Sequence, residues 1–330
     1  MNLLGKEILI LDGGLGTTLE DEHHIKLDGR TPLWSSHTLV EGVSTLRTVQ
    51  EDFARAGADV IMTATYQASF HGFANTKTTR PGGIEKDEAK QLMLSAVTIA
   101  REAFGDRRGL VALSLGAYGA TMVPGAEYSG LYGSMVEAGL YEFHLDRLNV
   151  FVNSEEWNEV DLVAFETLPR LDEVRAARRV MQDVKGKDYW IACVFPNDDA
   201  KLPDGTDIDT LVRTMLEGED RPFAMGINCT KIHKISALIL AFEEAAKSQG
   251  FDLPRLVLYP DAAGGKVYDT KLWQWIGNDE DEAPWGEQVT QIVSEVRKRA
   301  AWQGIIVGGC CKASPQHIKK LRSCLDSQDE

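Results

Sequence analysis

The sequence predicts one α/β domain, a single (β/α)8 TIM-type barrel over residues 1–330. Three observations lead to this fold. Eight strand-like runs alternate with eight helical runs, and no repeat or low-complexity tract interrupts the order. Several of the strand-like runs are apolar without alternation, as expected for strands that are buried on both faces. The length of 330 residues also suits such a barrel. A doubly wound open sheet is the alternative, because the same alternation serves either fold.

The expected strands are short runs rich in apolar and β-branched residues. The first run is followed directly by Asp12, and the fourth ends in Phe165-Glu166. The sixth and the eighth both stop at cysteine. In chain order the runs cover 7–11, 60–66, 110–115, 160–166, 189–195, 225–229, 256–259 and 305–310.

The expected helices carry apolar residues at helical spacing. The first of them places Val43, Leu46 and Phe53 on one stripe. Pro315 suits the first turn of the last helix, where its missing N–H costs nothing. In chain order these helices cover 40–56, 86–104, 140–152, 171–184, 208–216, 235–246, 286–301 and 315–325.

Two segments fit neither pattern. Residues 18–39 are polar and irregular, and residues 116–133 form a long segment rich in Gly and Tyr with one Pro. A loop that long inside a compact domain is either functional or disordered, and its aromatic residues favour a function. The turn at Asp12-Gly13-Gly14 invites a dinucleotide-binding interpretation, but Leu19 stands where the third glycine belongs and no clear helix follows. A turn whose amides face a small anion fits better.

Composition excludes several classes of function. The chain is 43% apolar and 26% charged, which is ordinary for a globular protein, and its formal net charge is −15. Nucleic acid or an anionic membrane is therefore not an expected partner. The N-terminal residues show no basic region followed by an apolar stretch, and no run of the chain suits a membrane span. We therefore expect a cytoplasmic protein.

Two strand-like runs end in cysteines, one at Cys229 and one at Cys310-Cys311. Because side chains alternate along a strand, the two adjacent cysteines face one point only if the strand ends and the chain turns there. Gly308-Gly309 supplies the backbone freedom for that turn. Three converging thiolates would leave one tetrahedral position open, which is the pattern of a catalytic zinc site.

Two simpler interpretations of these cysteines stay open from spacing alone. Cys310 and Cys311 would form a vicinal disulfide, or the three cysteines would be unconnected and act as small apolar residues. Five cysteines in a reducing compartment argue against a disulfide framework. Cys193 and Cys324 are expected to be packing or surface residues.

The ends of the expected strands bring carboxyl and thiol side chains together at one place. In a barrel of this kind the active site lies at the C-terminal mouth, where Asp12, Glu166 and the three cysteines would meet. Zinc on three thiolates carries a formal charge of about −1, so its Lewis acidity is quenched and it suits a soft thiol as fourth partner. A coordinated thiol is deprotonated but stays electron-rich. The site therefore favours thiol alkylation over hydrolysis.

The ordered motifs resemble those of the homocysteine S-methyltransferase family. The segment Gly226-Ile227-Asn228-Cys229, followed by Gly308-Gly309-Cys310-Cys311, is similar to the zinc-site signature of that family. Asp12-Gly13-Gly14 and Phe165-Glu166-Thr167 match it in the expected order. The similarity runs from about residue 8 to residue 321.

This resemblance implies an enzyme that methylates homocysteine to methionine, with one zinc per chain held by Cys229, Cys310 and Cys311. It further implies that Asp12 and Glu166 hold the homocysteine ammonium group, which needs carboxylate partners when buried. The amides of Gly13 and Gly14 would take the carboxylate of homocysteine. The alternative for each acid is a strand-end carboxylate that caps a loop.

One segment after the third expected strand bears on the methyl donor. Residues 127–132 resemble a segment of the subgroup that uses S-methylmethionine or S-adenosylmethionine. Tyr128 and Tyr132 would then lie over a sulfonium group, an interaction worth about 0.5–2 kcal/mol, with Trp285 as a weaker candidate. Alternatively, these aromatic side chains only pack the loop.

Two departures from the family pattern have no assigned role. Tyr118 follows Gly116-Ala117 where relatives often have Gly-Pro, and Asp261 stands where they often carry Asn. Asp261 either adds negative charge that favours a cationic donor or anchors the Gly264-Gly265 turn.

Two competing hypotheses remain. One is a zinc- or thiol-binding sensor on an inactive barrel, and the other is the same enzyme with betaine or methyltetrahydrofolate as donor. The expected partners are small molecules, homocysteine and a sulfonium donor. No heptad or exposed apolar stripe indicates an oligomeric state.

Overall fold

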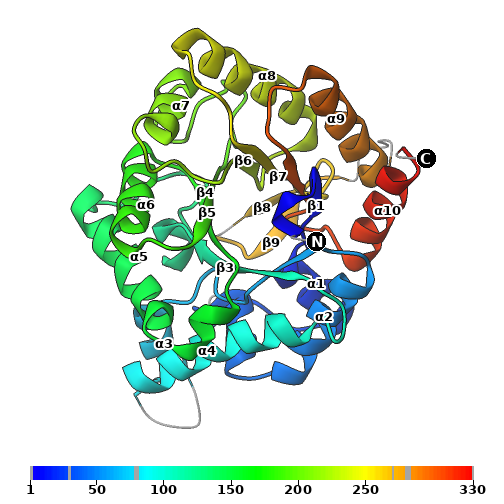
Figure 1. The fold of residues 1–330 in the computed structure, drawn as a ribbon. Helices are drawn as coiled ribbons and strands as arrows, with labels where there is room; N and C mark the ends of the chain where they lie inside the picture. The colour runs from blue at the N-terminus through cyan, green and yellow to red at the C-terminus, as the bar shows by residue number, and fades with distance from the viewer. Residues whose placement is uncertain (1–2, 29–30, 78–81, 270, 279–283, 329–330) are drawn as a thin grey trace.

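Eight parallel strands form one sheet at the centre of the computed structural model, which describes residues 3–28, 31–77, 82–269, 271–278 and 284–328. Figure 1 shows helices in a ring around these strands. The order in the sheet is β1-β10-β7-β6-β5-β4-β3-β2. The strands are β1 (Ile8–Ile10), β2 (Val60–Met62), β3 (Leu110–Gly116), β4 (Leu162–Leu168), β5 (Asp188–Cys193), β6 (Ala224–Asn228), β7 (Arg255–Tyr259) and β10 (Ile305–Val307).

The sheet closes on itself between its first and last strands. Ile8 pairs with Ile305, so β1 lies beside β10, and Leu11 forms a parallel bridge with Val60 at the start of β2. The backbone N–H of Asp59 also donates to the carbonyl of Ile10 at 2.6 Å. These bonds satisfy both edges of the sheet, which confirms the barrel and excludes the open doubly wound alternative.

Helices follow the strands along the chain, and they confirm the expected alternation. The eight expected helices all form, with ends that move by a few residues. The described helices are α1 (Leu15–His23), α2 (Val43–Arg55), α3 (Phe70–Ala74), α4 (Lys86–Glu102), α5 (Glu137–Val152), α6 (Leu171–Val184), α7 (Ile208–Leu216), α8 (Ile232–Gln249), α9 (Trp285–Arg299) and α10 (Pro315–Asp326).

The expectation that no helix directly follows the first glycine turn is wrong. Helix α1 begins at Leu15, and a 3-10 helix covers Trp34–Leu39. The sequence signal for α1 is weak because the helix has no side-chain cap and Leu19 is its one fully buried large apolar side chain. Its buried Gly16 lies against the Trp34 ring, so tertiary packing stabilises what local propensity does not.

Two more elements lie outside all of the expected strands and helices. The segment after β7 contains a two-stranded antiparallel hairpin, β8 (Val267–Asp269) and β9 (Gln274–Ile276). The short helix α3 follows β2, and the side chain of Ser69 caps it by accepting from the N–H of Gly72. Both elements are too short for a periodicity to be recognised.

Apolar side chains fill two layers, one inside the barrel and one between the strands and the helices. Leu9 and Leu11 belong to the inner cluster, whereas Ile10 between them belongs to the outer one. Because neighbouring side chains point to opposite faces, a strand buried on both faces must be apolar at every position. None of the described helices has the length and apolarity that crossing a bilayer requires.

Candidate active site

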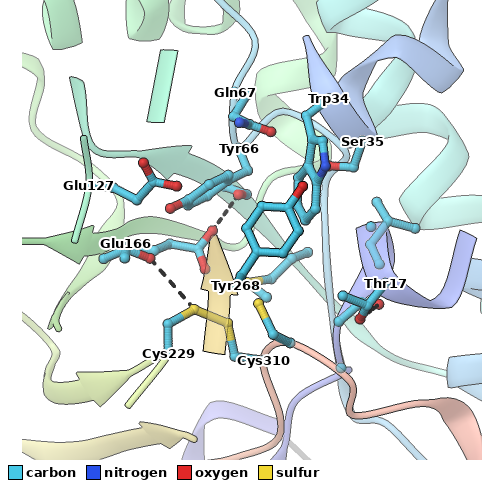
Figure 2. A pocket seen from close by; sticks show the side chains of 18 of the residues that line it. Thr17, Trp34, Ser35, Tyr66, Gln67, Glu127, Glu166, Cys229, Tyr268 and Cys310 are labelled. Atoms are coloured by element: carbon cyan, nitrogen blue, oxygen red, sulfur yellow. Dashed lines mark hydrogen bonds between the residues drawn. A yellow bond between two sulfur atoms is a disulfide. The ribbon is translucent and has the colours of Figure 1, made fainter. Parts of the chain in front are cut away.

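A cavity opens at the C-terminal ends of the barrel strands. Asp12, Glu166, Cys229, Cys310 and Cys311 all line it, as the sequence predicted. The first turn of α1 and the β8–β9 hairpin complete its wall (Figure 2).

The three predicted metal ligands converge in this cavity. Their sulfur atoms all lie within 4.8 Å of one another, although Cys229 and Cys310 are 81 residues apart. In this structure Cys229 and Cys310 form a disulfide, with their Cα atoms 5.4 Å apart, and Cys311 is a free thiol. The expectation of no disulfide is therefore wrong for this pair, because the fold brings together thiols that are distant in the sequence. The vicinal disulfide does not form.

The two remaining cysteines lie outside the cavity. Cys193 is buried in the outer core at the end of β5, and Cys324 is a half-buried thiol in α10. Their positions agree with packing and surface roles.

Cys229 is held in place by a contact with β4, which lies two strands from β6 in the sheet. The side-chain amide of Asn228 donates to the hydroxyl of Thr167 at 2.8 Å and accepts from the N–H of Thr167 at 2.9 Å. The same amide lies 3.4 Å from the Cys229 sulfur. Cys229 adopts a left-handed backbone with φ of 44°, so the chain leaves β6 there and turns its thiol to the mouth.

Gly308 and Gly309, which precede Cys310, lie so close to neighbouring atoms that a side chain would not fit. Neither Gly308 nor Gly309 has a positive φ, so the expectation of special backbone freedom is wrong. A Cβ on Gly308 would lie 2.6 Å from the carbonyl oxygen of Asp12, and one on Gly309 would lie 2.1 Å from the Cβ of Ala313. Glycine is therefore needed because the turn packs directly against the residues that follow β1 and against Ala313.

The donor set fits a soft metal ion such as zinc. Three thiols from two chain segments offer soft ligands, with no fourth His, Cys, Asp or Glu in the same described cluster. Burial raises the pKa of Cys311 to about 12, and nearby Asp261 adds to the rise, so metal binding must release the thiol proton. The disulfide must also be reduced before Cys229 and Cys310 can bind a metal.

Asp12 lines the cavity and has one unpaired carboxyl oxygen. Its Oδ2 accepts from the N–H of Met62 at 2.9 Å, while its buried Oδ1 has no hydrogen-bond partner in the structure. Burial raises the pKa of Asp12 well above its usual value, and Glu166 raises it further. A cationic group would satisfy Oδ1 and restore the charged form.

Glu166 is the second carboxyl at the floor of the cavity. Its Oε1 accepts from the hydroxyl of Ser114, and the hydroxyl of Tyr259 also hydrogen-bonds to the carboxyl group. Tyr259 in turn accepts from Trp190 Nε1 at 3.2 Å. Burial raises the pKa of Glu166 to about 7 despite these partners. The two acids therefore share a buried site that would favour an ammonium group.

Gly13 and Gly14 line the cavity, but the N–H of Gly14 already donates to the carbonyl of Ala313 at 2.9 Å. The amides of Leu15, Gly16 and Thr17 belong to the first turn of α1, where N–H groups have no intrahelical acceptor. This helix start favours an anion near the turn.

The predicted donor-site aromatic residues separate into two groups. Tyr128 lines the cavity, and its hydroxyl hydrogen-bonds to the thiol of Cys311. Tyr132 instead donates its hydroxyl to Glu173 at 2.8 Å, and Trp285 donates its ring N–H to the carbonyl of Asp261 at 3.0 Å. Neither belongs to the described lining, and both contacts suit packing.

The two departures from the family pattern have structural partners. The N–H of Tyr118 donates to Glu173 at 2.6 Å, and its ring packs edge-on against Tyr132. Asp261 accepts from Lys231 at 3.3 Å, and Lys231 also donates to the carbonyl of Gly264. These contacts support the turn-anchoring interpretation of Asp261.

Several residues of the cavity were missed from the sequence. Tyr66 is the last residue of the second expected strand, and this position at a strand end could have identified it as a residue of the mouth. Trp34 comes from segment 18–39, which was expected to be irregular. Tyr268, Trp273 and Trp275 lie between the expected strand 256–259 and the expected helix 286–301, so nothing local placed these rings at the mouth.

The closed barrel and the three cysteines at its mouth define the class of protein, a barrel with a thiol-rich site. Comparison with known proteins identifies its family. The model of the homocysteine S-methyltransferase family matches residues 9–325. This chain belongs to the homocysteine S-methyltransferase family, and it is an enzyme of the methyltransferase class.

Curated relatives cover nearly the whole chain. Homocysteine S-methyltransferase 2 of Arabidopsis thaliana is 32% identical over 96% of this chain and 92% of its own length. Homocysteine S-methyltransferase of Escherichia coli K12 is 31% identical, covering 96% and 95%. Selenocysteine Se-methyltransferase of Brassica oleracea is 31% identical, covering 97% and 89%.

A solved relative has the same fold. The metallated form of the homocysteine methyltransferase MmuM from Escherichia coli superposes with a TM-score of 0.73 at 29% identity, covering 96% of each chain. The oxidised form of the same protein gives a TM-score of 0.72 at 27% identity, covering 98% and 97%.

Proposed function

We propose that this chain transfers a methyl group from S-methylmethionine, or from S-adenosylmethionine, to homocysteine and so forms methionine. The observation that carries the proposal is the convergence of three cysteine sulfurs within 4.8 Å beside the carboxyls of Asp12 and Glu166. One zinc on Cys229, Cys310 and Cys311 would supply an open coordination position that favours the thiolate form of an incoming thiol. The chain would act as one homocysteine-binding domain in the cytoplasm, in methionine biosynthesis.

The residues of the chain position the acceptor. Asp12 Oδ1 and the Glu166 carboxylate would accept hydrogen bonds from the homocysteine ammonium group, because both are buried without a cation among the described lining residues. The amides at the start of α1 would bind its carboxylate. Held at both ends, the acceptor would direct its thiol toward the cysteines.

The transfer itself is a displacement at carbon. The homocysteine thiolate would attack the methyl carbon, so that a new C–S bond forms while the sulfonium C–S bond breaks. With S-methylmethionine both products are methionine, and the thiol proton is released to solvent. The rings of Tyr66, Tyr128 and Tyr268 line the cavity and would exclude water from the sulfonium.

A donor panel tests this proposal. The reduced, zinc-loaded protein is given homocysteine and, in separate reactions, S-methylmethionine, S-adenosylmethionine, betaine or methyltetrahydrofolate, and methionine is measured. Turnover with a sulfonium donor is expected. Turnover with betaine or methyltetrahydrofolate alone would reject the donor assignment. Zinc binding without turnover on any donor would favour the sensor.

A further inference from the structure

The cavity contains a third carboxyl group that the acceptor does not use. Glu127 lies on the loop after β3, lines the cavity and is only 9% exposed. Its Oε2 is buried and has no hydrogen-bond partner in the structure. Figure 2 shows its side chain beside Tyr66, on the loop side of the cavity.

The loop is built to hold this carboxyl in place. The N–H of Ala126 donates to the carbonyl of Gly119 at 2.9 Å, and the N–H of Gly130 donates to Ala126 at 2.8 Å. A Cβ on Gly125 would lie 2.5 Å from Oε2 of Glu127, so glycine leaves the space that the carboxyl occupies. The side chain therefore stays over the cavity in a defined conformation.

The charges around the cavity call for a second cation. Asp12, Glu127 and Glu166 all line it, and none of its described lining residues is Lys, Arg or His. Homocysteine brings one ammonium group, which Asp12 and Glu166 would hold. A buried carboxylate is costly without a partner, so the unpaired oxygen of Glu127 needs a cationic hydrogen-bond donor. A sulfonium group carries a positive charge but has no N–H to donate. An ammonium group has both the positive charge and N–H donors.

We propose that Glu127 binds the α-ammonium group of the methyl donor, which selects an amino-acid sulfonium such as S-methylmethionine over sulfonium compounds that lack an amine. The side-chain oxygen of Gln67 is a second acceptor for the same group, because it is buried without a partner while Gln67 Nε2 donates to the carbonyl of Ala120 at 2.9 Å. This inference rests on the function proposed above.

The test compares Glu127→Gln with the wild-type enzyme, both reduced and zinc-loaded. Glutamine keeps the shape of the glutamate side chain but lacks its negative charge. We expect the KM for S-methylmethionine to rise about 10- to 100-fold, with the KM for homocysteine unchanged. Calorimetric titration with S-methylmethionine should show the same loss of affinity. Glu137→Gln is the matched control, because Glu137 is half-exposed at the start of α5 and pairs with Arg175 at 3.6 Å.

A donor analogue identifies the group that Glu127 recognises. Dimethylsulfoniopropionate has the sulfonium and carboxylate groups but no amine, so the wild type should bind it more weakly than S-methylmethionine, and Glu127→Gln should not weaken its binding further. Equal S-methylmethionine KM and affinity in Glu127→Gln and the wild type would overturn this inference and leave the proposed function intact. An equal loss for both compounds would mean that Glu127 recognises the sulfonium and would overturn the ammonium assignment. A wild type that uses betaine alone, which has no N–H, would overturn both proposals.

Discussion

The side chain of Asn228 joins the ends of β6 and β4 through two hydrogen bonds with Thr167, at 2.8 and 2.9 Å. Both residues are fully buried, and Thr167 has a left-handed φ of 60°. These two bonds hold Cys229 and Glu166 in a fixed relation, because Cys229 follows Asn228 and Glu166 precedes Thr167 in the chain.

Replacing Asn228 by Ala should therefore weaken both the fold and the metal site. The buried N–H of Thr167 would lose its acceptor, at a cost of about 1–3 kcal/mol, which urea unfolding measures. Zinc affinity should fall about 10- to 100-fold, as for other residues that orient a ligand, and a chelator competition measures it. Unchanged zinc affinity together with reduced stability would assign Asn228 to structure alone.

Zinc binding should depend on reduction and on all three cysteines. The reduced wild-type protein should bind about one zinc per chain, and the protein with the Cys229–Cys310 disulfide intact should bind none at that site. Cys310→Ala should lose the metal and the activity together, as measured by elemental analysis and a methionine assay. Cys324→Ala is the control, because this free thiol lies in α10 away from the cavity. Full methyl transfer by zinc-free Cys310→Ala would contradict the proposed chemistry.

Glu166→Gln should impair the acceptor site. A charge-assisted hydrogen bond to the homocysteine ammonium group would become a neutral one, so we expect the KM for homocysteine to rise about 10- to 100-fold. The KM for the methyl donor should change little. Steady-state kinetics with each substrate varied in turn separates the two effects, and a rise confined to the donor would place homocysteine elsewhere.

The same substitution should change how stability depends on pH in the metal-free, substrate-free protein. Burial raises the pKa of Glu166 to about 7, above its value in the unfolded chain, so between pH 4.5 and 7 only the folded state keeps the proton. Stability should therefore fall as pH rises through this window. Glu166→Gln should remove this part of the decrease, on the order of 1–3 kcal/mol between pH 5 and pH 8. Identical pH profiles of the wild type and the variant in urea unfolding would show that the pKa of Glu166 is not raised.

Much of the barrel was predictable because its signals are local. Strands such as 256–259 are apolar throughout, and helices such as 171–184 carry a regular apolar stripe, so both were placed to within a few residues. Helix α1 and the β8–β9 hairpin were not predicted, because a weakly amphipathic nine-residue helix and two three-residue strands acquire their stability from contacts elsewhere in the chain.

The sequence by itself determined the chemistry that the site can hold: three cysteines and two acids at the ends of expected strands, in the order typical of one family. Only the tertiary structure decided their relation in space. It joined Cys229 to Cys310, directed Tyr128 into the cavity and Tyr132 away from it, and left an oxygen of Glu127 unpaired. The physical reason is that strand periodicity reports only which face a residue occupies, whereas closure of the barrel and packing of its loops determine which side chains from distant segments meet.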